Sequence, residues 1–237
     1  MVGNVVVAER RELTRRAADW LAQEIGKAIG ARGGCAIALS GGETPRPVYR
    51  ELSAAPRIDR VQWNRVHVYF VDERAVPPDD PASNYRTARE TLLERVAIPA
   101  SQIHRMEAER PDVNAAAAEY EQLLPAALDI LVLGMGSDGH TASLFPESPA
   151  LGERVRRVVH AQSPTPPVNR LTITPPVIAT ARLIVVLVTG SEKAPQVAKV
   201  LRGPVNPELL PAQLARPGTW FVDTDAAALL GPPFSDQ

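Results

Sequence analysis

The sequence has one cysteine and no long apolar run, and each shortage excludes a class of protein. Cys35 cannot form an internal disulfide, so a disulfide-stapled scaffold is excluded and a reducing compartment is favoured. The longest aliphatic run, 183–188, is far shorter than a membrane span. The valines at 5–7 are too few for the core of a signal peptide. These features predict a cytoplasmic protein without a membrane partner.

Strong charge of either sign is missing as well. The chain of 237 residues carries 26 lysines and arginines against 27 aspartates and glutamates, a formal net charge of −1. Such a chain has no general attraction for nucleic acid or for an anionic membrane, so any anion site must be local. With no basic patch or helix-turn-helix region, no nucleic-acid partner is expected.

Strand-like and helix-like segments alternate along the chain. Apolar residues at steps of three and four over 13–28 predict a helix that ends at Gly33 and Gly34. Short runs rich in β-branched residues predict buried strands at 35–39, 66–71, 129–133 and 182–188. Further helical patterns cover 45–53, 83–96, 113–124 and 191–201. This alternation predicts an α/β protein with a mostly parallel open sheet and helices on both faces. Because no linker divides residues 1–237, we expect a single domain, with a loose tail over the last few residues.

The segment LSGGETP, residues 39–45, follows a predicted strand and opens a helix. Gly41 and Gly42 let the backbone approach an anion, Ser40 and Thr44 offer hydroxyl groups, and the helix start supplies free N–H groups. These features suit a phosphate cradle, although the GxxxxGK[ST] pattern of a P-loop is absent. A tight strand-to-helix turn explains the same residues equally well.

The triplet Asp72-Glu73-Arg74 also follows a predicted strand. Two acids beside an arginine are typical of a solvated loop start. The end of a strand in an open α/β sheet is, however, where ligands bind, which favours a functional role.

The segment DILVLGMGSDGHTASLFP, residues 129–146, has three glycines at GxGxxG spacing. A dinucleotide site is disfavoured, because the strand-like run at 155–161 ends without the acid that would bind a ribose hydroxyl. A nucleophile elbow is excluded, because Met135 occupies the first glycine position of GxSxG. What remains is a turn that presents Asp138 and His140. Imidazole titrates near neutrality, as a general base should, and a nearby carboxylate can orient it.

Two cations lie near the ends of other segments, Arg170 in NRLTIT and Lys193 in TGSEKA. We expect Lys193 in the first turn of a helix, where the helix dipole disfavours a cation unless it serves a bound anion. The remaining histidines lack the spacing of metal ligands, so no metal site is predicted.

Together and in this order, the motifs ALSGGETP, VYFVDERAVPPDDPASNY, DILVLGMGSDGHTASLFP, RLTITP and LVTGSEKA resemble those of the 6-phosphogluconolactonase family. The resemblance spans residues 35 to about 222. It implies a NagB/Rossmann-like three-layer sandwich, shared with glucosamine-6-phosphate deaminase, that acts on a cytosolic sugar phosphate without a cofactor. The implied reaction is hydrolysis of 6-phosphogluconolactone.

The resemblance also implies roles for the candidate residues. We predict a catalytic group of His140, Asp138, Arg74 and Asp72, with His140 as the base and Arg74 near the reacting lactone. The residues expected around the phosphate are Ser40, Gly41, Gly42, Thr44, Arg170 and Lys193. At position 43 the family usually has a small hydroxyl residue, so we expect the carboxylate of Glu43 to face solvent.

Two other functions stay open, a sugar-phosphate isomerase or deaminase and a non-catalytic sugar-phosphate sensor. The deaminases carry a glutamate five residues after the histidine, where this chain has Phe145. A sensor would usually add a DNA-binding segment. The sequence does not indicate an oligomeric state.

Overall fold

The computed structural model describes residues 1–231, and the loose tail predicted at the end of the chain lies outside these residues. The helices are α1 (Arg10–Arg32), α2 (Pro45–Leu52), α3 (Asn84–Thr91), α4 (Val113–Leu123), α5 (Pro175–Thr180) and α6 (Ala194–Arg202). The strands are β1 (Val5–Ala8), β2 (Cys35–Leu39), β3 (Val66–Phe70), β4 (Asp72–Arg74), β5 (Ile130–Gly134), β6 (Val158–Gln162), β7 (Asn169–Ile173), β8 (Leu183–Val188) and β9 (Thr219–Asp223).

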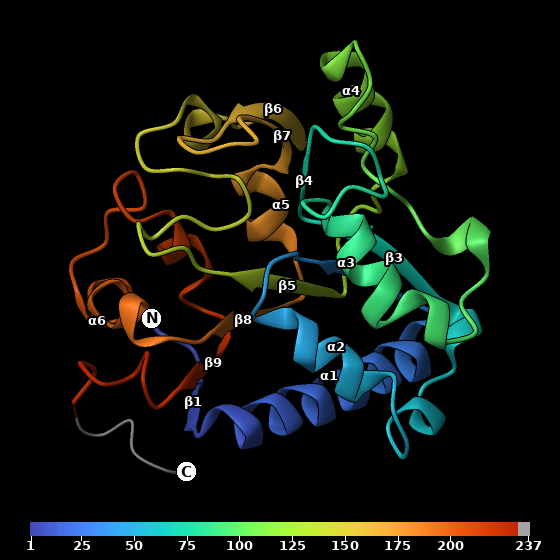
Figure 1. Cartoon of the computed structure of the whole chain (residues 1–237), viewed down its shortest axis with the longest axis horizontal. Coiled ribbons are helices and arrows are strands. Elements are labelled where there is room, and N and C mark those ends of the chain that lie inside the picture. The colour runs from blue at the N-terminus through green and yellow to red at the C-terminus, as the bar shows by residue number, and fades with distance from the viewer. Residues whose placement is uncertain (232–237) are drawn as a thin grey trace.

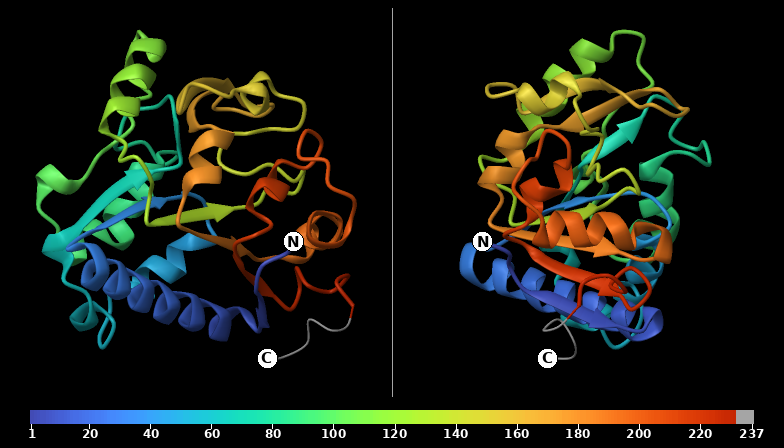
Figure 2. Two further views of the ribbon diagram at one scale, coloured as in Figure 1. Left: turned by 180° about the vertical axis from the view of Figure 1, so that it is seen from behind. Right: turned by 90° about the vertical axis from the view of Figure 1, so that its left-hand side faces the viewer.

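The larger sheet has the strand order β1-β9-β8-β5-β2-β3, and every neighbouring pair is parallel. Helix α1 runs along the lower side of the molecule in Figure 1, and the β6–β7 ribbon lies at the top with the larger sheet between them (Figures 1 and 2). The prediction of an α/β fold built on a mostly parallel sheet with flanking helices is confirmed. The prediction of one domain over residues 1–237 stays a prediction.

The smaller sheet, in the order β4-β7-β6, is antiparallel and was not expected. Its strand β4 is the triplet Asp72-Glu73-Arg74, which pairs with Arg170 to Thr172 of β7. The acids of this triplet are buried, so the interpretation as a solvated loop start is wrong. Three residues carry no detectable strand periodicity, and the partner strand lies far away in sequence. Arg170 therefore stands near the start of an antiparallel strand, not after the end of a parallel one.

Helix α1 follows its predicted pattern closely. Leu13, Ala17, Leu21 and Ile25 are buried, and the helix ends at Gly33. Gly33 has a φ of +79°, a conformation that glycine adopts without strain. In residues 1–231 no helix combines the length and the apolarity that crossing a membrane requires.

The helix predicted at 191–201 starts later than expected. Ser191–Lys193 form a 3-10 turn, and α6 begins only at Ala194. Pro195 sets this start, because proline lacks an N–H group and fits only the first turn of a helix. Lys193 therefore precedes the α-helix.

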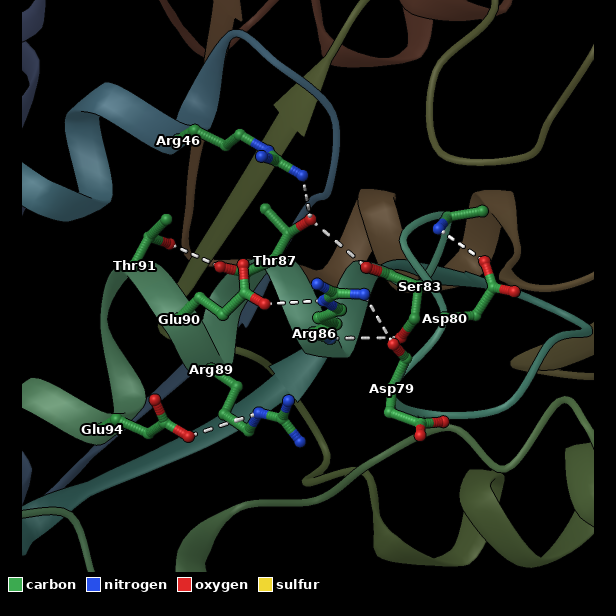
Figure 3. Close-up of polar contacts among 11 residues, drawn as sticks. Arg46, Asp79, Asp80, Ser83, Arg86, Thr87, Arg89, Glu90, Thr91 and Glu94 are labelled. Atoms are coloured by element: carbon green, nitrogen blue, oxygen red, sulfur yellow. Dashed lines mark hydrogen bonds and ion pairs between the residues drawn. The ribbon is translucent and has the colours of Figure 1, made fainter.

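The loop that follows β4 is held against the start of α3 (Figure 3). Ser83 Oγ caps the helix by accepting a hydrogen bond from the Arg86 N–H at 3.1 Å, and the Arg86 guanidinium donates to the Asp79 carbonyl at 2.7 Å. From α2, Arg46 donates to Thr87 Oγ1 at 3.3 Å. These contacts fix the start of α3 beside the start of α2.

Candidate active site

A cavity of about 480 Å³ opens where β2, β5 and β8 end. The predicted site residues that line it are Ser40, Gly41, Gly42, Thr44, Asp72, Arg74, His140, Arg170 and Lys193. Asp138, the remaining predicted residue, is bonded to His140 and is not part of the lining. Parallel strands place their carboxyl ends at one edge of the sheet, which explains how segments so distant in sequence meet here.

His140 is held by the turn that follows β5. Its Nδ1 lies 2.6 Å from Asp138 Oδ1, and its backbone N–H donates to the same oxygen at 3.0 Å. Because a carboxylate accepts, Nδ1 carries the proton and Nε2 is left as the acceptor. Burial raises the pKa of Asp138, but the hydrogen bonds and charge of His140 outweigh burial and the pKa lies below its ordinary value. Asp138 is therefore ionised at neutral pH and orients the imidazole.

Two glycines of the GxGxxG pattern, Gly136 and Gly139, allow His140 to take its position. A Cβ at Gly136 would lie 2.2 Å from the ring atoms Cε1 and Nδ1 of His140, so a larger residue would push the imidazole away. Gly139 has a φ of +87°, which turns the chain between Asp138 and His140. On another side, the ring of Phe145 lies 4.7 Å from the imidazole, centroid to centroid.

Two arginines are neighbours across the smaller sheet. Arg74 and Arg170 are register partners in β4 and β7. Arg74 donates to the Ala82 carbonyl, and Arg170 donates through Nε to the Pro167 carbonyl at 2.8 Å. Within residues 1–231 neither guanidinium forms an ion pair. Burial, and then the charge of Arg74, lowers the pKa of Arg170. Like charges held together in this way favour an anionic ligand.

The loop from Ser40 to Thr44 forms another part of the lining. Gly42 has a φ of +92°, and Thr44 Oγ1 lies 3.0 Å from Thr189 Oγ1 in the loop after β8. The Ser40 carbonyl accepts a hydrogen bond from the Tyr49 hydroxyl at 2.8 Å, whereas Ser40 Oγ is buried without a partner among the described residues. A free hydroxyl beside the N–H groups that open α2 suits an anion.

Glu43 faces solvent, as expected. Its side chain is 88% exposed, and Oε1 lies 3.3 Å from Arg46 Nε. The carboxylate is therefore turned toward a cation of α2 and leaves the loop open to an anion.

Lys193 reaches the cavity from the loop after β8. It is half-buried and forms no ion pair in the described part of the chain. Burial lowers its pKa, although the charges of Glu192 and Asp223 act in the opposite direction. Lys193 thus resembles the two arginines, a cation without a carboxylate partner.

The two acids of β4 are used differently. Glu73 accepts hydrogen bonds from the N–H groups of Asn84 and Tyr85, each at 2.8 Å, and so holds the start of α3. Asp72 lines the cavity, but its Oδ1 accepts from Asn84 Nδ2 at 2.9 Å and its Oδ2 accepts from Ser143 Oγ at 2.7 Å. With both oxygens engaged, Asp72 is arranged to position its neighbours.

Sequence reasoning missed several lining residues. Asn84 and Ser143 both contact Asp72, and the loop 163–167 forms a wall beside Arg170. Asn84 and Ser143 lie within motifs that already contained predicted site residues, and this proximity was the available signal. No group of three or more histidine, cysteine, aspartate or glutamate side chains suited to a metal occurs in residues 1–231, and the metal-free site stays a prediction.

The sequence matches the family described as "Glucosamine-6-phosphate isomerases/6-phosphogluconolactonase" over residues 8–224. A 6-phosphogluconolactonase of Mycobacterium tuberculosis is 41% identical, covering 92% of this chain and 94% of the relative. One from Synechocystis is 37% identical, covering 96% and 98%. The crystal structure of 6-phosphogluconolactonase from Thermotoga maritima superposes with a TM-score of 0.82 at 29% identity, covering 94% of this chain and all of that one. The resemblance seen in the motifs is confirmed, and the chain belongs to the glucosamine-6-phosphate isomerase/6-phosphogluconolactonase family.

Proposed function

We propose that the protein hydrolyses 6-phosphogluconolactone to 6-phosphogluconate. The observation that carries the proposal is one cavity that holds a histidine with an open Nε2 together with three cations, Arg74, Arg170 and Lys193, that have no ion-pair partner in residues 1–231. A base and an anion site are what hydrolysis of a phosphorylated lactone requires. The names of the relatives point to the same reaction.

In the proposed reaction, water attacks the carbonyl carbon of the lactone, and His140 Nε2 takes a proton from that water. The carbonyl oxygen becomes an oxyanion, which the guanidinium of Arg74 stabilises. The intermediate collapses when the bond from this carbon to the ring oxygen breaks, and the imidazolium gives its proton to the leaving ring oxygen. Asp138 stabilises the imidazolium between these two transfers. No covalent bond to the enzyme is needed.

The substrate's phosphate is assigned to the loop from Ser40 to Thr44. Arg170 and Lys193 face the same cavity from β7 and from the loop after β8. Binding of the phosphate, which is remote from the reacting carbon, orients the lactone toward His140, and orientation is a large part of catalysis.

The test is an assay of the purified protein on freshly prepared 6-phosphogluconolactone, compared with spontaneous hydrolysis. Turnover is expected without added metal or nucleotide and in excess chelator. Binding of the phosphorylated ligand without turnover would instead identify a sensor. Activity that chelation abolished and zinc restored would contradict the metal-free mechanism.

Deamination of glucosamine 6-phosphate is the main competing reaction. Family resemblance implies a glutamate five residues after the histidine for that chemistry, and at that position Phe145 lies with its ring tilted against His140, 4.7 Å between the ring centroids. We therefore expect no ammonia release from glucosamine 6-phosphate. Robust release would reverse the ranking of the two enzymes.

A further inference from the structure

Asn84, the first residue of α3, lines the cavity and is only 2% exposed. Its backbone N–H donates to Glu73 Oε1 at 2.8 Å. Its side-chain Nδ2 donates at 2.9 Å to both the carbonyl oxygen and Oδ1 of Asp72. Because both partners are acceptors, the orientation of the amide is determined, and Asn84 Oδ1 points away from Asp72.

Asn84 Oδ1 lies against the phosphate loop. A Cβ at Gly41 would be 1.7 Å from this oxygen and 2.3 Å from Asn84 Cγ, so the amide fills the space that a side chain at position 41 would need. Asn84 Oδ1 is buried without a hydrogen-bond partner among the described residues. A buried acceptor that stays unpaired is costly, and its retention indicates a functional constraint.

Asp72 continues the chain of contacts on its other side. Its Oδ2 accepts from Ser143 Oγ at 2.7 Å, and the Ser143 N–H donates to Thr172 Oγ1 at 3.1 Å. Ser143 follows His140 by three residues, and Ala142 between them has a φ of +49°. A non-glycine residue keeps such a conformation only where neighbouring contacts hold it. The bonds to Ser143 contribute to that restraint, as does Thr141 Oγ1, which donates to the Gly134 carbonyl at 2.8 Å.

We propose that Asn84 is a positioning residue that couples the phosphate loop, through Asp72 and Ser143, to the turn that carries His140. This inference rests on the proposed function, because it takes residues 40–44 as the phosphate site and His140 as the base. A phosphate bound at Gly41 restrains the backbone that contacts the Asn84 amide, and this amide is bonded to Asp72. Binding of the phosphorylated lactone is thereby transmitted to the turn that holds His140, the base that activates the attacking water.

The direct test follows the His140 ring by NMR during titration with inorganic phosphate. The chain has four histidines, so the ring signals are few, and His140→Ala assigns the one of interest. In the wild type, saturation with phosphate is expected to shift the His140 signals. In Asn84→Ala the shift at saturation should be much smaller. An equal shift in both proteins would mean that the charge of the phosphate acts on the His140 signals directly and not through Asn84, and this result would overturn the coupling.

Asn169→Ala is the matched control. Asn169 is an exposed asparagine of β7 whose Oδ1 lies 3.0 Å from His160 Nε2, and it does not line the cavity. Its variant should keep the wild-type shift of His140. A shift lost in this control as well would show that removal of any asparagine amide has the effect, and the coupling would be rejected.

Kinetics provide the second readout. Asn84→Ala is expected to lower kcat/KM for the phosphorylated lactone by roughly 10²-fold, the typical cost of a misplacement of about 1 Å, and to affect the unphosphorylated lactone much less. Asn84→Asp keeps the shape, but its ionised carboxylate cannot donate to Asp72, so the same loss is expected. Wild-type turnover in Asn84→Asp would overturn the role of these bonds.

Three further outcomes separate the possibilities. A lower Tm with an unchanged preference for the phosphorylated lactone would mean a merely structural role and would overturn the inference. If Asn84→Ala does not fold, Ser143→Ala removes one hydroxyl at the far end of the same chain of contacts and should change the preference in the same direction. Inactivity of the wild type on the phosphorylated lactone would contradict the proposed function, while the NMR titration would still decide the coupling.

Discussion

The two ends of the cavity are built in opposite ways. At the base end, the imidazole of His140 is already bonded to Asp138, with 2.6 Å between Nδ1 and Oδ1. At the end that we propose for the phosphate, Arg170 and Lys193 have no ion-pair partner in the described part of the chain, and Ser40 Oγ is buried without a partner there. A group that must have one tautomer and one direction is paired within the protein. Groups that are proposed to bind an anion have no carboxylate partner within the described part of the protein.

The largest effect is expected at the base end. His140→Ala should lower kcat by about 10²- to 10⁴-fold with little change in KM, because general acid-base catalysis acts on the transition state. Steady-state kinetics on folded protein measures this loss. His160→Ala is the matched control, since His160 does not line the cavity, and it should keep full activity. A His140 variant that loses thermal stability but keeps wild-type turnover per folded molecule would show a structural histidine.

The phosphate end should respond in KM. Lys193→Ala removes one charge-assisted hydrogen bond to the phosphate, and about 1.5 to 3 kcal/mol predicts a roughly 10- to 150-fold weaker binding of the phosphorylated lactone. The unphosphorylated lactone lacks this contact and should react equally slowly with wild type and variant.

Kinetics of the wild type and of Lys193→Ala on both lactones test this prediction. Equal impairment of the two would place Lys193 at the reacting ring or in folding, and the phosphate site would have to be redrawn without it. The contrast between the two ends would then fail.

The same contrast predicts a pH dependence. Burial lowers the pKa of Lys193, and a lysine is charged only below its pKa. Affinity for 6-phosphogluconate should therefore fall as the pH rises through this lowered pKa, several-fold and at lower pH than for an exposed lysine, whose pKa is about 10.4. Calorimetric titration from neutral to alkaline pH measures the change. In Lys193→Ala this decline should vanish, and a decline of the same size in the variant would assign it to another group.

The sequence predicted the parts of this site that depend on local pattern. Parallel strands have their carboxyl ends at the same edge of the sheet, and the loops that follow them meet there. Ser40, His140 and Lys193 could therefore be expected to lie close together. Side-by-side placement of Arg74 and Arg170 could not, because it depends on the antiparallel pairing of β4 with β7. A strand of three residues has too short a pattern to detect, and its register is set by tertiary contacts.

The chain of contacts through Asp72 could not be predicted from the sequence, for a related reason. As a sequence feature, two acids beside an arginine are typical of a solvated loop start, and only their position at the end of a strand favoured a functional role. Only the structure shows that both oxygens of Asp72 are engaged, by Asn84 from α3 and by Ser143 from the segment after β5. Side-chain partners so far apart in the chain leave no periodic signal.

The smallest effect is expected at Glu43, in the loop that we propose for the phosphate. Its side chain is 88% exposed and turned toward Arg46, so Glu43→Gln should change the free energy of unfolding by less than about 0.5 kcal/mol. The lost negative charge should lower KM for the phosphorylated lactone by less than about threefold at low salt, and screening should remove even this difference at high salt. Thermal unfolding and kinetics at two ionic strengths measure both. A tenfold or larger fall in KM that persists at high salt would mean that the carboxylate of Glu43 points into the proposed phosphate site. The cations there would then have a carboxylate neighbour within the protein, as His140 has in Asp138, and the contrast between the two ends would be wrong.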